Sequence, residues 1–154
     1  MSEFLPDERA TIELAGRFGA ALPDSLAGWT VLLAGELGTG KSTFARALIR
    51  TLGHSGAVPS PTYTLVEPYQ VPRGPIYHVD LYRVASDDEL RYLGWNEIDD
   101  GLRLVEWPER APGLAEQADL QLTLAYSGAG RTACFLALSE KGRQLAATLV
   151  DSKT

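Results

Sequence analysis

The segment Gly35–Thr43 reads GELGTGKST, and its first eight residues fit the pattern G-x-x-x-x-G-K-[ST]. This pattern forms a phosphate-binding loop, in which backbone N–H groups point inward and make a nest for an anion. The two glycines let the backbone approach a phosphate with no Cβ atom in the way. Lys41 would supply a positive charge for the β- and γ-phosphates, and the Ser42 hydroxyl would be a hard oxygen ligand for Mg²⁺. These residue types therefore indicate the binding of a nucleoside triphosphate with Mg²⁺.

The residues on either side of this loop have the pattern of a strand followed by a helix. Thr30–Ala34 is a short apolar run with β-branched residues, which is typical of a buried parallel strand. After the loop, Phe44, Leu48 and Leu52 recur at a helical interval, and Gly53 is a fitting C-cap. The phosphate site would then lie at a helix N-terminus, whose dipole favours anions.

Two carboxylates are candidates for completing the site, which needs an acid near the metal and a group that positions water. Asp80 lies in the alternating stretch Ile76–Val84, where an acid costs free energy unless it is paired or bound to a metal. Glu106 follows an apolar pair near the end of Leu102–Trp107. We expect both carboxylates to face the metal–phosphate region, with Glu106 nearer to the metal or the attacking water. A solvated or salt-bridged acid at a sheet edge is the alternative for each.

The segment Ser60–Thr64 carries several hydroxyl groups after a link rich in Gly, Pro and Ser. Such a loop is able to order around the γ-phosphate and Mg²⁺, as switch loops do. A strand that starts at a structural proline fits the same residues. His54 and His78 lack metal-ligand spacing, so we expect the first to be solvated and the second to be structural.

Composition and charge limit the compartment and the partners. The 154 residues, 45% of them apolar, are expected to form one domain, 1–154. A net charge of −6 without a basic run argues against tight direct binding of RNA or DNA, so any link to nucleic acid would pass through another protein. There is no apolar run long enough to span a membrane and no basic, apolar secretory signal at the acidic N-terminus. With a single cysteine, Cys134, that we expect to be buried, these features predict a cytoplasmic protein.

The remaining pattern alternates strands with helices, which indicates an α/β sheet. We expect a P-loop NTPase-like three-layer fold with a mixed sheet, made of a parallel core and a C-terminal antiparallel hairpin around Ser127–Gly130. A capping box at Ser86–Glu89 predicts a short helix that ends at Gly94. The other expected elements are a helix from about Asp7 to Leu22, extended stretches at 62–69, 119–126 and 131–138, and a final helix at 140–150.

Four motifs occur in an order that resembles the TsaE family, small bacterial ATPases of tRNA threonylcarbamoyladenosine synthesis. They are GELGTGKST at 35–43, SPTYTLVEPY at 60–69, YHVDLYR at 77–83 and LVEWPE at 104–109. The combination is far more specific than the phosphate-binding loop alone, and the resemblance runs from about residue 5 to about residue 149. It implies slow hydrolysis of ATP with Mg²⁺ and binding to the TsaB–TsaD pair. In that family the pair modifies the tRNA, and the ATP cycle would reset the complex between turnovers. The chain itself would contact tRNA only indirectly, through the pair.

The resemblance also implies roles for individual residues. Asp80 would be the Walker-B-like acid, Glu106 a metal-associated or catalytic carboxylate and Trp107 its structural neighbour. Ser42 stands where many relatives carry Thr, and either hydroxyl is able to bind Mg²⁺. The implied metal ligands are Ser42, Asp80 and Glu106, and the catalytic set is Lys41, Asp80 and Glu106. The implied nucleotide contacts are Glu8, Thr11, Gly38, Thr39, Gly40, Lys41, Ser42, Thr43, Thr62 and Arg131, of which Thr11 is equally well a buried structural residue and Arg131 a solvated one.

Two other classes of function stay open from the sequence. A small-molecule kinase would need an acceptor pocket and a lid with several arginines, whereas the arginines after Glu106 are scattered. A nucleotide-gated binding module would use ATP binding without needing hydrolysis. A GTPase is disfavoured because the chain has no N-K-x-D stretch to recognise guanine.

Overall fold

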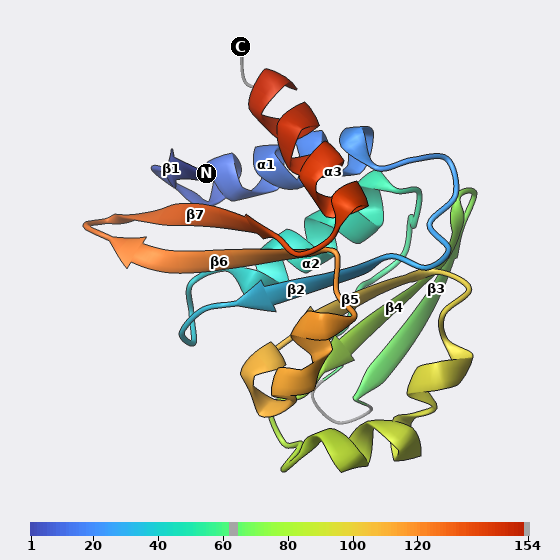
Figure 1. Cartoon of the computed structure of the whole chain (residues 1–154). Coiled ribbons are helices and arrows are strands. Elements are labelled where there is room, and N and C mark those ends of the chain that lie inside the picture. The colour runs from blue at the N-terminus through green and yellow to red at the C-terminus, as the bar shows by residue number, and fades with distance from the viewer. Residues whose placement is uncertain (62–64, 153–154) are drawn as a thin grey trace.

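The computed structural model describes residues 1–61 and 65–152, which form a mixed sheet with helices on both faces. Figure 1 shows the strands of this sheet fanning across the middle of the molecule. Their order is β1-β7-β6-β2-β5-β4-β3. The strands are β1 (Ser2–Leu5), β2 (Thr30–Ala34), β3 (Val66–Val71), β4 (Gly74–Asp80), β5 (Leu102–Glu106), β6 (Leu120–Ser127) and β7 (Gly130–Ala137).

The centre of the sheet is parallel and both edges are antiparallel. β6, β2, β5 and β4 run parallel to one another, and β7 pairs antiparallel with β6 as the hairpin signal predicted. The expected α/β fold with a mixed sheet is thus confirmed. The other edge adds a second antiparallel pair, β3 with β4, and the short β1 extends the hairpin edge by pairing with β7.

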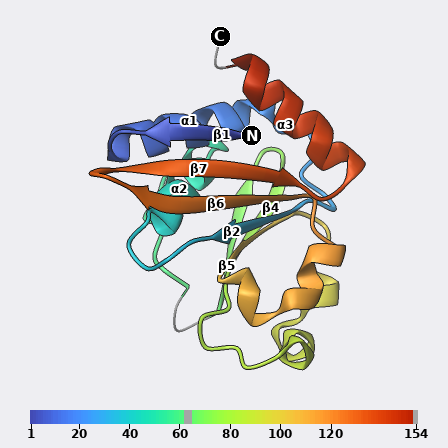
Figure 2. The same cartoon turned by 60° about the vertical axis from the view of Figure 1, so that its left-hand side comes forward.

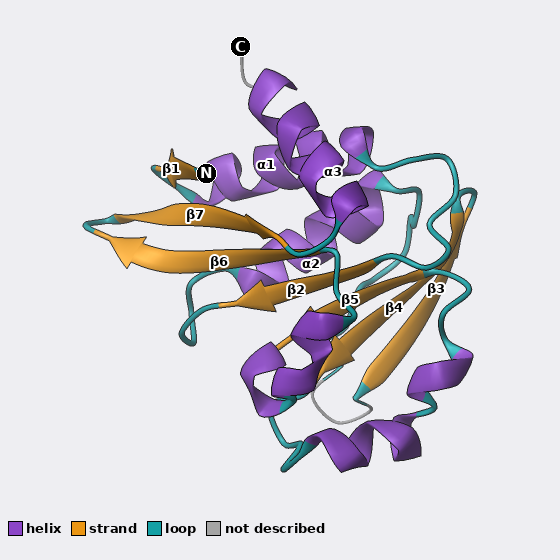
Figure 3. Ribbon diagram, viewed as in Figure 1, coloured by secondary structure: helices purple, strands orange, loops and turns teal. Residues whose placement is uncertain are grey.

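The two faces of the sheet are covered by different kinds of helix. Helices α1 (Glu8–Ala21), α2 (Lys41–Thr51) and α3 (Glu140–Ser152) lie on one face, as Figures 1 and 2 show. The opposite face carries short 3₁₀ helices, drawn in purple below the sheet in Figure 3. These are η1 (Asp87–Leu93), η2 (Trp95–Glu97), η3 (Pro108–Arg110) and η4 (Pro112–Glu116).

Each face has its own apolar core. On the α-helical face, Phe18 of α1 packs edge-to-face on Phe44 of α2, with ring centroids 5.5 Å apart, and stacks on Phe135 of β7. On the opposite face, Trp95 packs with Val79 and Val105 of the central strands. Burial of apolar surface on both faces stabilises the parallel strands, and it fixes which strand residues point toward α2.

Several boundaries differ from the sequence prediction. The strand predicted over 76–84 is wrong at both ends, because β4 begins at Gly74 and ends at Asp80. The helix predicted after Ser86 is a 3₁₀ helix, and its expected capping box is absent: Glu89 accepts a hydrogen bond from the N–H of Ala85 instead. The left-handed Gly94 does end η1, as predicted.

Cys134 is exposed, so its predicted burial is wrong. It alternates with the buried Ala133 and Phe135 along β7, and it therefore points to the face of the sheet opposite the α-helices. Among residues 1–61 and 65–152, no helix is long and apolar enough to cross a membrane.

Candidate nucleotide-binding site

The phosphate-binding loop connects the end of β2 to the start of α2, as predicted. Gly38 and Gly40 have φ values of 82° and 109°, in the left-handed region that favours glycine. A Cβ atom on Gly38 would lie 2.8 Å from the hydroxyl of Tyr126, and one on Gly35 would meet the carbonyl oxygen of Leu124. The loop therefore lies directly against β6 and keeps its turn only with glycine at these positions.

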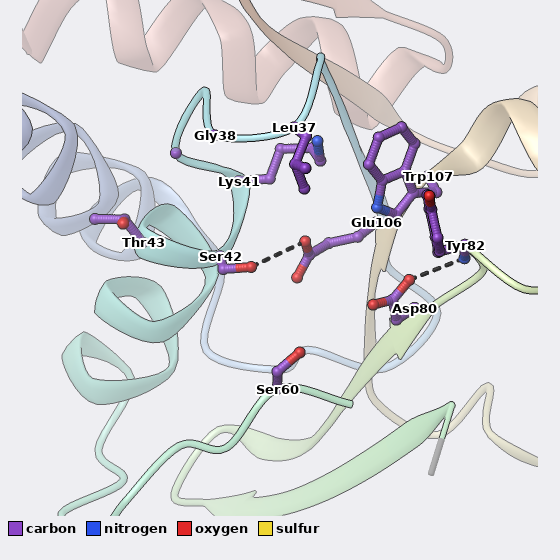
Figure 4. Close-up of a pocket in the computed structure, with 11 residues that line it drawn as sticks. Leu37, Gly38, Lys41, Ser42, Thr43, Ser60, Asp80, Tyr82, Glu106 and Trp107 are labelled. Carbon is purple, nitrogen blue, oxygen red and sulfur yellow. Dashed lines mark hydrogen bonds between the residues drawn. The ribbon is translucent and has the colours of Figure 1, made fainter. Parts of the chain in front are cut away.

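A cavity of about 500 Å³ opens beside this loop. It lies at the edge where β2, β4 and β5 end, and the carboxyl ends of parallel strands are where α/β proteins bind ligands. Figure 4 shows its lining residues, which come from the loop, α2, the connection that follows α2, and the chain at the ends of β4 and β5. Those that the sequence singled out are Gly38, Gly40, Lys41, Ser42, Thr43, Ser60, Asp80, Glu106 and Trp107, and the sequence did not single out Leu37 and Tyr82.

The two candidate acids lie side by side because of the strand register. Asp80 of β4 pairs with Glu106 of β5 at the end of both strands, and both residues are buried. Glu106 Oε1 accepts a hydrogen bond from Ser42 Oγ at 3.2 Å, while Asp80 Oδ1 accepts one from the N–H of Tyr82 at 2.9 Å (Figure 4). Both acids line the cavity beside the loop, and that they face a metal and a phosphate stays a prediction.

The oxygen atoms gathered here fit a magnesium ion. Ser42 Oγ and a Glu106 oxygen are already within hydrogen-bond distance of each other, and Asp80 is the strand neighbour of Glu106. Mg²⁺ is usually held by one or two carboxylates together with phosphate oxygens and water, not by a complete cage of protein ligands. Within the described ranges there is no cluster of three His, Cys, Asp or Glu side chains that would make such a cage. The oxygen atoms of these three side chains thus suit a Mg²⁺ ion that is also bound to the phosphates of a nucleotide.

Lys41 lies between the loop and Trp107. Its Nζ donates hydrogen bonds to the carbonyl oxygens of Gly35 and Glu36 and lies 4.0 Å from the centroid of the Trp107 ring. Burial lowers the pKa of Lys41, and the negative charges of Glu106 and nearby acids oppose that shift. A phosphate group that enters the cavity would therefore replace the two carbonyl oxygens as the hydrogen-bond partner of the Lys41 ammonium group.

Trp107 reaches this position through an unusual backbone conformation. Its φ of 60° lies in the left-handed region, which is costly for a large side chain. This turn ends β5 one residue before the predicted strand end, and the Trp107 ring packs on Lys41 and on Tyr82. The sequence predicted a structural neighbour of Glu106 that could also shape the site, and Trp107 does line the cavity.

A smaller cavity of about 150 Å³ lies on the other side of the loop. It brings together Glu8 and Thr11 of α1 with Arg131 of β7, the three residues implied as contacts at the N-terminal helix and the late hairpin. Thr11 is almost fully buried, in keeping with the structural alternative.

Thr39 lines this cavity too, but its hydroxyl donates to the carbonyl of Glu36, so its side chain shapes the loop. Thr62 lies outside the described residues.

His78 lies behind the cavity and contacts one of its lining residues, whereas the sequence predicted only a structural role for it. Its Nε2 is 2.6 Å from Glu106 Oε2, and both side chains are buried. Position 78 is two residues before Asp80 on the same strand, so both side chains point to the same face of the sheet. This two-residue spacing from Asp80 is the sequence signal that could have identified His78.

The tip of the β6–β7 hairpin holds the outer side of the phosphate-binding loop. Tyr126 Oη donates to the carbonyl oxygen of Leu37 at 2.5 Å, and an Arg131 guanidinium nitrogen donates to that of Gly38 at 3.2 Å. The guanidinium also stacks over the Tyr126 ring, 4.5 Å from its centroid. In a trans peptide the C=O and N–H groups point in opposite directions. Because these two carbonyl groups point toward the hairpin, the N–H groups of the same peptides point toward the inside of the loop.

We expect Tyr126→Phe to weaken nucleotide binding about three- to tenfold, because the variant loses one hydrogen bond that orients the loop. Tyr126 is half exposed, so the melting temperature should change little. Calorimetric titration with ATP measures the change. Tyr92→Phe, which removes the hydroxyl of a Tyr that is 86% exposed, is the matched control. Equal affinities of Tyr126→Phe and the wild type would show that the hydrogen bond to Leu37 does not orient the loop.

Comparison with known proteins gives the same family as the sequence motifs. The family model described as threonylcarbamoyl adenosine biosynthesis protein TsaE matches residues 5–133. The TsaE protein of Haemophilus influenzae is 34% identical over 149 residues, which cover 94% of each chain, and that of Synechocystis is 41% identical over 123 residues, or 76% of each chain. The crystal structure of Bacillus subtilis YdiB superposes with a TM-score of 0.77 at 26% identity, covering 100% of this chain and 96% of that one. The chain belongs to the TsaE family.

Proposed function

We propose that this protein is a Mg²⁺-dependent ATPase that supports threonylcarbamoyladenosine synthesis on tRNA. The observation that carries the proposal is the contact between Ser42 of the phosphate-binding loop and Glu106 at the end of β5. This contact joins a triphosphate-binding element to a buried carboxylate in one cavity, and metal-assisted phosphoryl transfer needs both. The role in tRNA modification rests on the TsaE family membership and on the names of the relatives.

The chemistry that follows is transfer of the γ-phosphoryl group to water. Lys41 and the inward N–H groups of the loop stabilise the negative charge of the β- and γ-phosphates. Ser42, Glu106 and Asp80 would hold Mg²⁺, which, when bound, neutralises phosphate charge and polarises the γ-phosphoryl group. One of the two carboxylates, Glu106 or Asp80, also accepts a hydrogen bond from the attacking water. The Trp107 ring covers one side of the Lys41 ammonium group, which is largely shielded from bulk water.

A partner complex would complete this site. Among the described residues that line the larger cavity there is no arginine, and fast phosphoryl transfer commonly uses one. We propose that the TsaB–TsaD pair supplies such a charge or orders the segment that begins at Ser60, and that ATP hydrolysis then resets the pair. The net charge of −6 supports contact with tRNA through these partners in the cytoplasm, not through the chain itself.

The test is steady-state ATP hydrolysis by the purified chain, alone and with the TsaB–TsaD pair from the same source. We expect slow turnover alone and at least tenfold faster turnover with the pair, because an added arginine contact contributes 10³–10⁵ in other phosphoryl-transfer enzymes. Bovine serum albumin at the same concentration is the control for non-specific stabilisation. An unchanged rate with the pair, combined with ADP formation only after a small acceptor is added, would favour a kinase instead.

A further inference from the structure

His78 is a buried polar residue that the proposed chemistry does not use. Its side chain is 1% exposed, and the Glu106 carboxylate that it contacts is 5% exposed. Both residues lie on the face of the sheet that packs against α2. A polar group in such a place costs free energy unless a hydrogen bond compensates it, and the 2.6 Å contact between His78 Nε2 and Glu106 Oε2 offsets part of that cost.

The contacts of Glu106 divide between its two oxygens. Oε1 accepts from Ser42 Oγ, and Oε2 lies against His78 Nε2. An ionised carboxylate only accepts hydrogen bonds, so Nε2 must carry the proton and donate it. The three side chains therefore form a chain of hydrogen bonds that runs from the loop, through Glu106, to β4.

The other ring nitrogen of His78 has no such partner among the described residues, so the contact with Glu106 is what orients the ring. Nδ1 is buried, and no described residue hydrogen-bonds to it. A histidine kept only to satisfy the core would be expected to use both nitrogens, since an unmet buried acceptor is unfavourable. Among the described residues, Glu106 is thus the one hydrogen-bond partner of the His78 ring.

We infer that His78 is a positioning residue that fixes the rotamer of Glu106, so that Oε1 stays beside Ser42 as a metal-binding edge. The inference rests on the proposed function, because it gives His78 a purpose only if Glu106 meets a metal ion. Carboxylates that bind metal ions are commonly held by an outer hydrogen-bond partner, which orients the ligand that touches the ion. With no donor at position 78, the carboxylate is free to rotate away from Ser42.

The experiment compares His78→Leu and His78→Gln. Leucine fills a similar volume without a donor, whereas the amide nitrogen of glutamine is able to replace Nε2. Calorimetric titration with ADP over a range of Mg²⁺ concentrations gives the Mg²⁺ concentration at half-maximal enhancement of ADP affinity, which does not depend on catalysis. We expect His78→Leu to raise that concentration 10–100-fold. ADP affinity in EDTA should stay within twofold of wild type, and His78→Gln should recover most of the Mg²⁺ response.

A second variant separates positioning from loss of stability. Val79→Ala removes methyl groups from the next residue of β4, which packs into the core on the opposite face. We expect Val79→Ala to lower the melting temperature with no change in the Mg²⁺ response. If His78→Leu responds to Mg²⁺ as wild type does, or if His78→Gln is no better than His78→Leu, the inference is overturned. A wild-type protein whose ADP affinity ignores Mg²⁺ would instead contradict the metal site of the proposed function.

Discussion

Lys41→Ala should lose ATP affinity by roughly tenfold to a hundredfold, the range expected for one hydrogen bond to a charged group. Turnover at saturating ATP should fall by about a further 10²–10³, because Lys41 also stabilises charge that develops on the γ-phosphoryl group. The structural reason for a large effect is that Lys41 is buried and that its partners, two loop carbonyls and the face of Trp107, carry no net charge. Its positive charge is therefore not neutralised by a direct partner among the described residues. Calorimetry gives the affinity, and phosphate release gives the rate.

The matched control for this experiment is Lys141→Ala. Lys141 lies in α3 and donates to the carbonyl of Gly28, before β2 begins, so it is at the opposite end of that strand from the loop. Removing its charge changes the net charge by the same amount and should leave ATP affinity within twofold of wild type. Near-normal binding and turnover by Lys41→Ala would mean that the loop does not hold the phosphates.

Glu106→Gln is the second large effect. The substitution keeps the shape of the side chain and one carbonyl oxygen, which is able to accept from His78 while the amide faces Ser42. We expect ATP affinity to stay within about fivefold of wild type, since Lys41 and the loop remain. Hydrolysis should fall by about 10²–10⁴, the range for loss of a group that assists proton transfer. Single-turnover measurements with excess protein separate the two steps.

Glu109→Gln is the control for the loss of one acidic charge. Glu109 is exposed in η3, three residues after Glu106, and it acts on Lys41 only through its charge. Its variant should hydrolyse ATP within about twofold of wild type. If Glu106→Gln binds ATP, fails to hydrolyse it and still fully supports tRNA modification, the nucleotide-gated binding module becomes the better description. Wild-type turnover by Glu106→Gln would remove Glu106 from the chemistry.

The loop and its flanking elements were predictable because their requirements are local. Each specified position from Gly35 to Ser42 meets a need of the loop itself, and the strand before it and the helix after it follow from short apolar patterns. The same holds for the hairpin, whose turn residues separate two alternating stretches. The four-motif resemblance to TsaE is confirmed by the family model and by the relatives.

What the sequence did not reveal depends on contacts between distant segments. The pairing of His78 with Glu106 needs the register of β4 against β5, and that of Tyr126 with Leu37 joins residues that are 89 positions apart. Local pattern also misled for Cys134, because an apolar strand indicates burial only where something covers both faces. The Ser2–Leu5 strand was missed because four residues are too few to show a period.

The central claim is that this cavity transfers the γ-phosphoryl group of ATP to water with the help of Mg²⁺. The measurement that tests it most directly is a single turnover of γ-labelled ATP with the protein in excess, with Mg²⁺ and with EDTA. The account predicts that the label appears as inorganic phosphate, in step with ADP, only when Mg²⁺ is present. ATP that stays bound and intact with Mg²⁺, or label that passes to a molecule other than water, would contradict it.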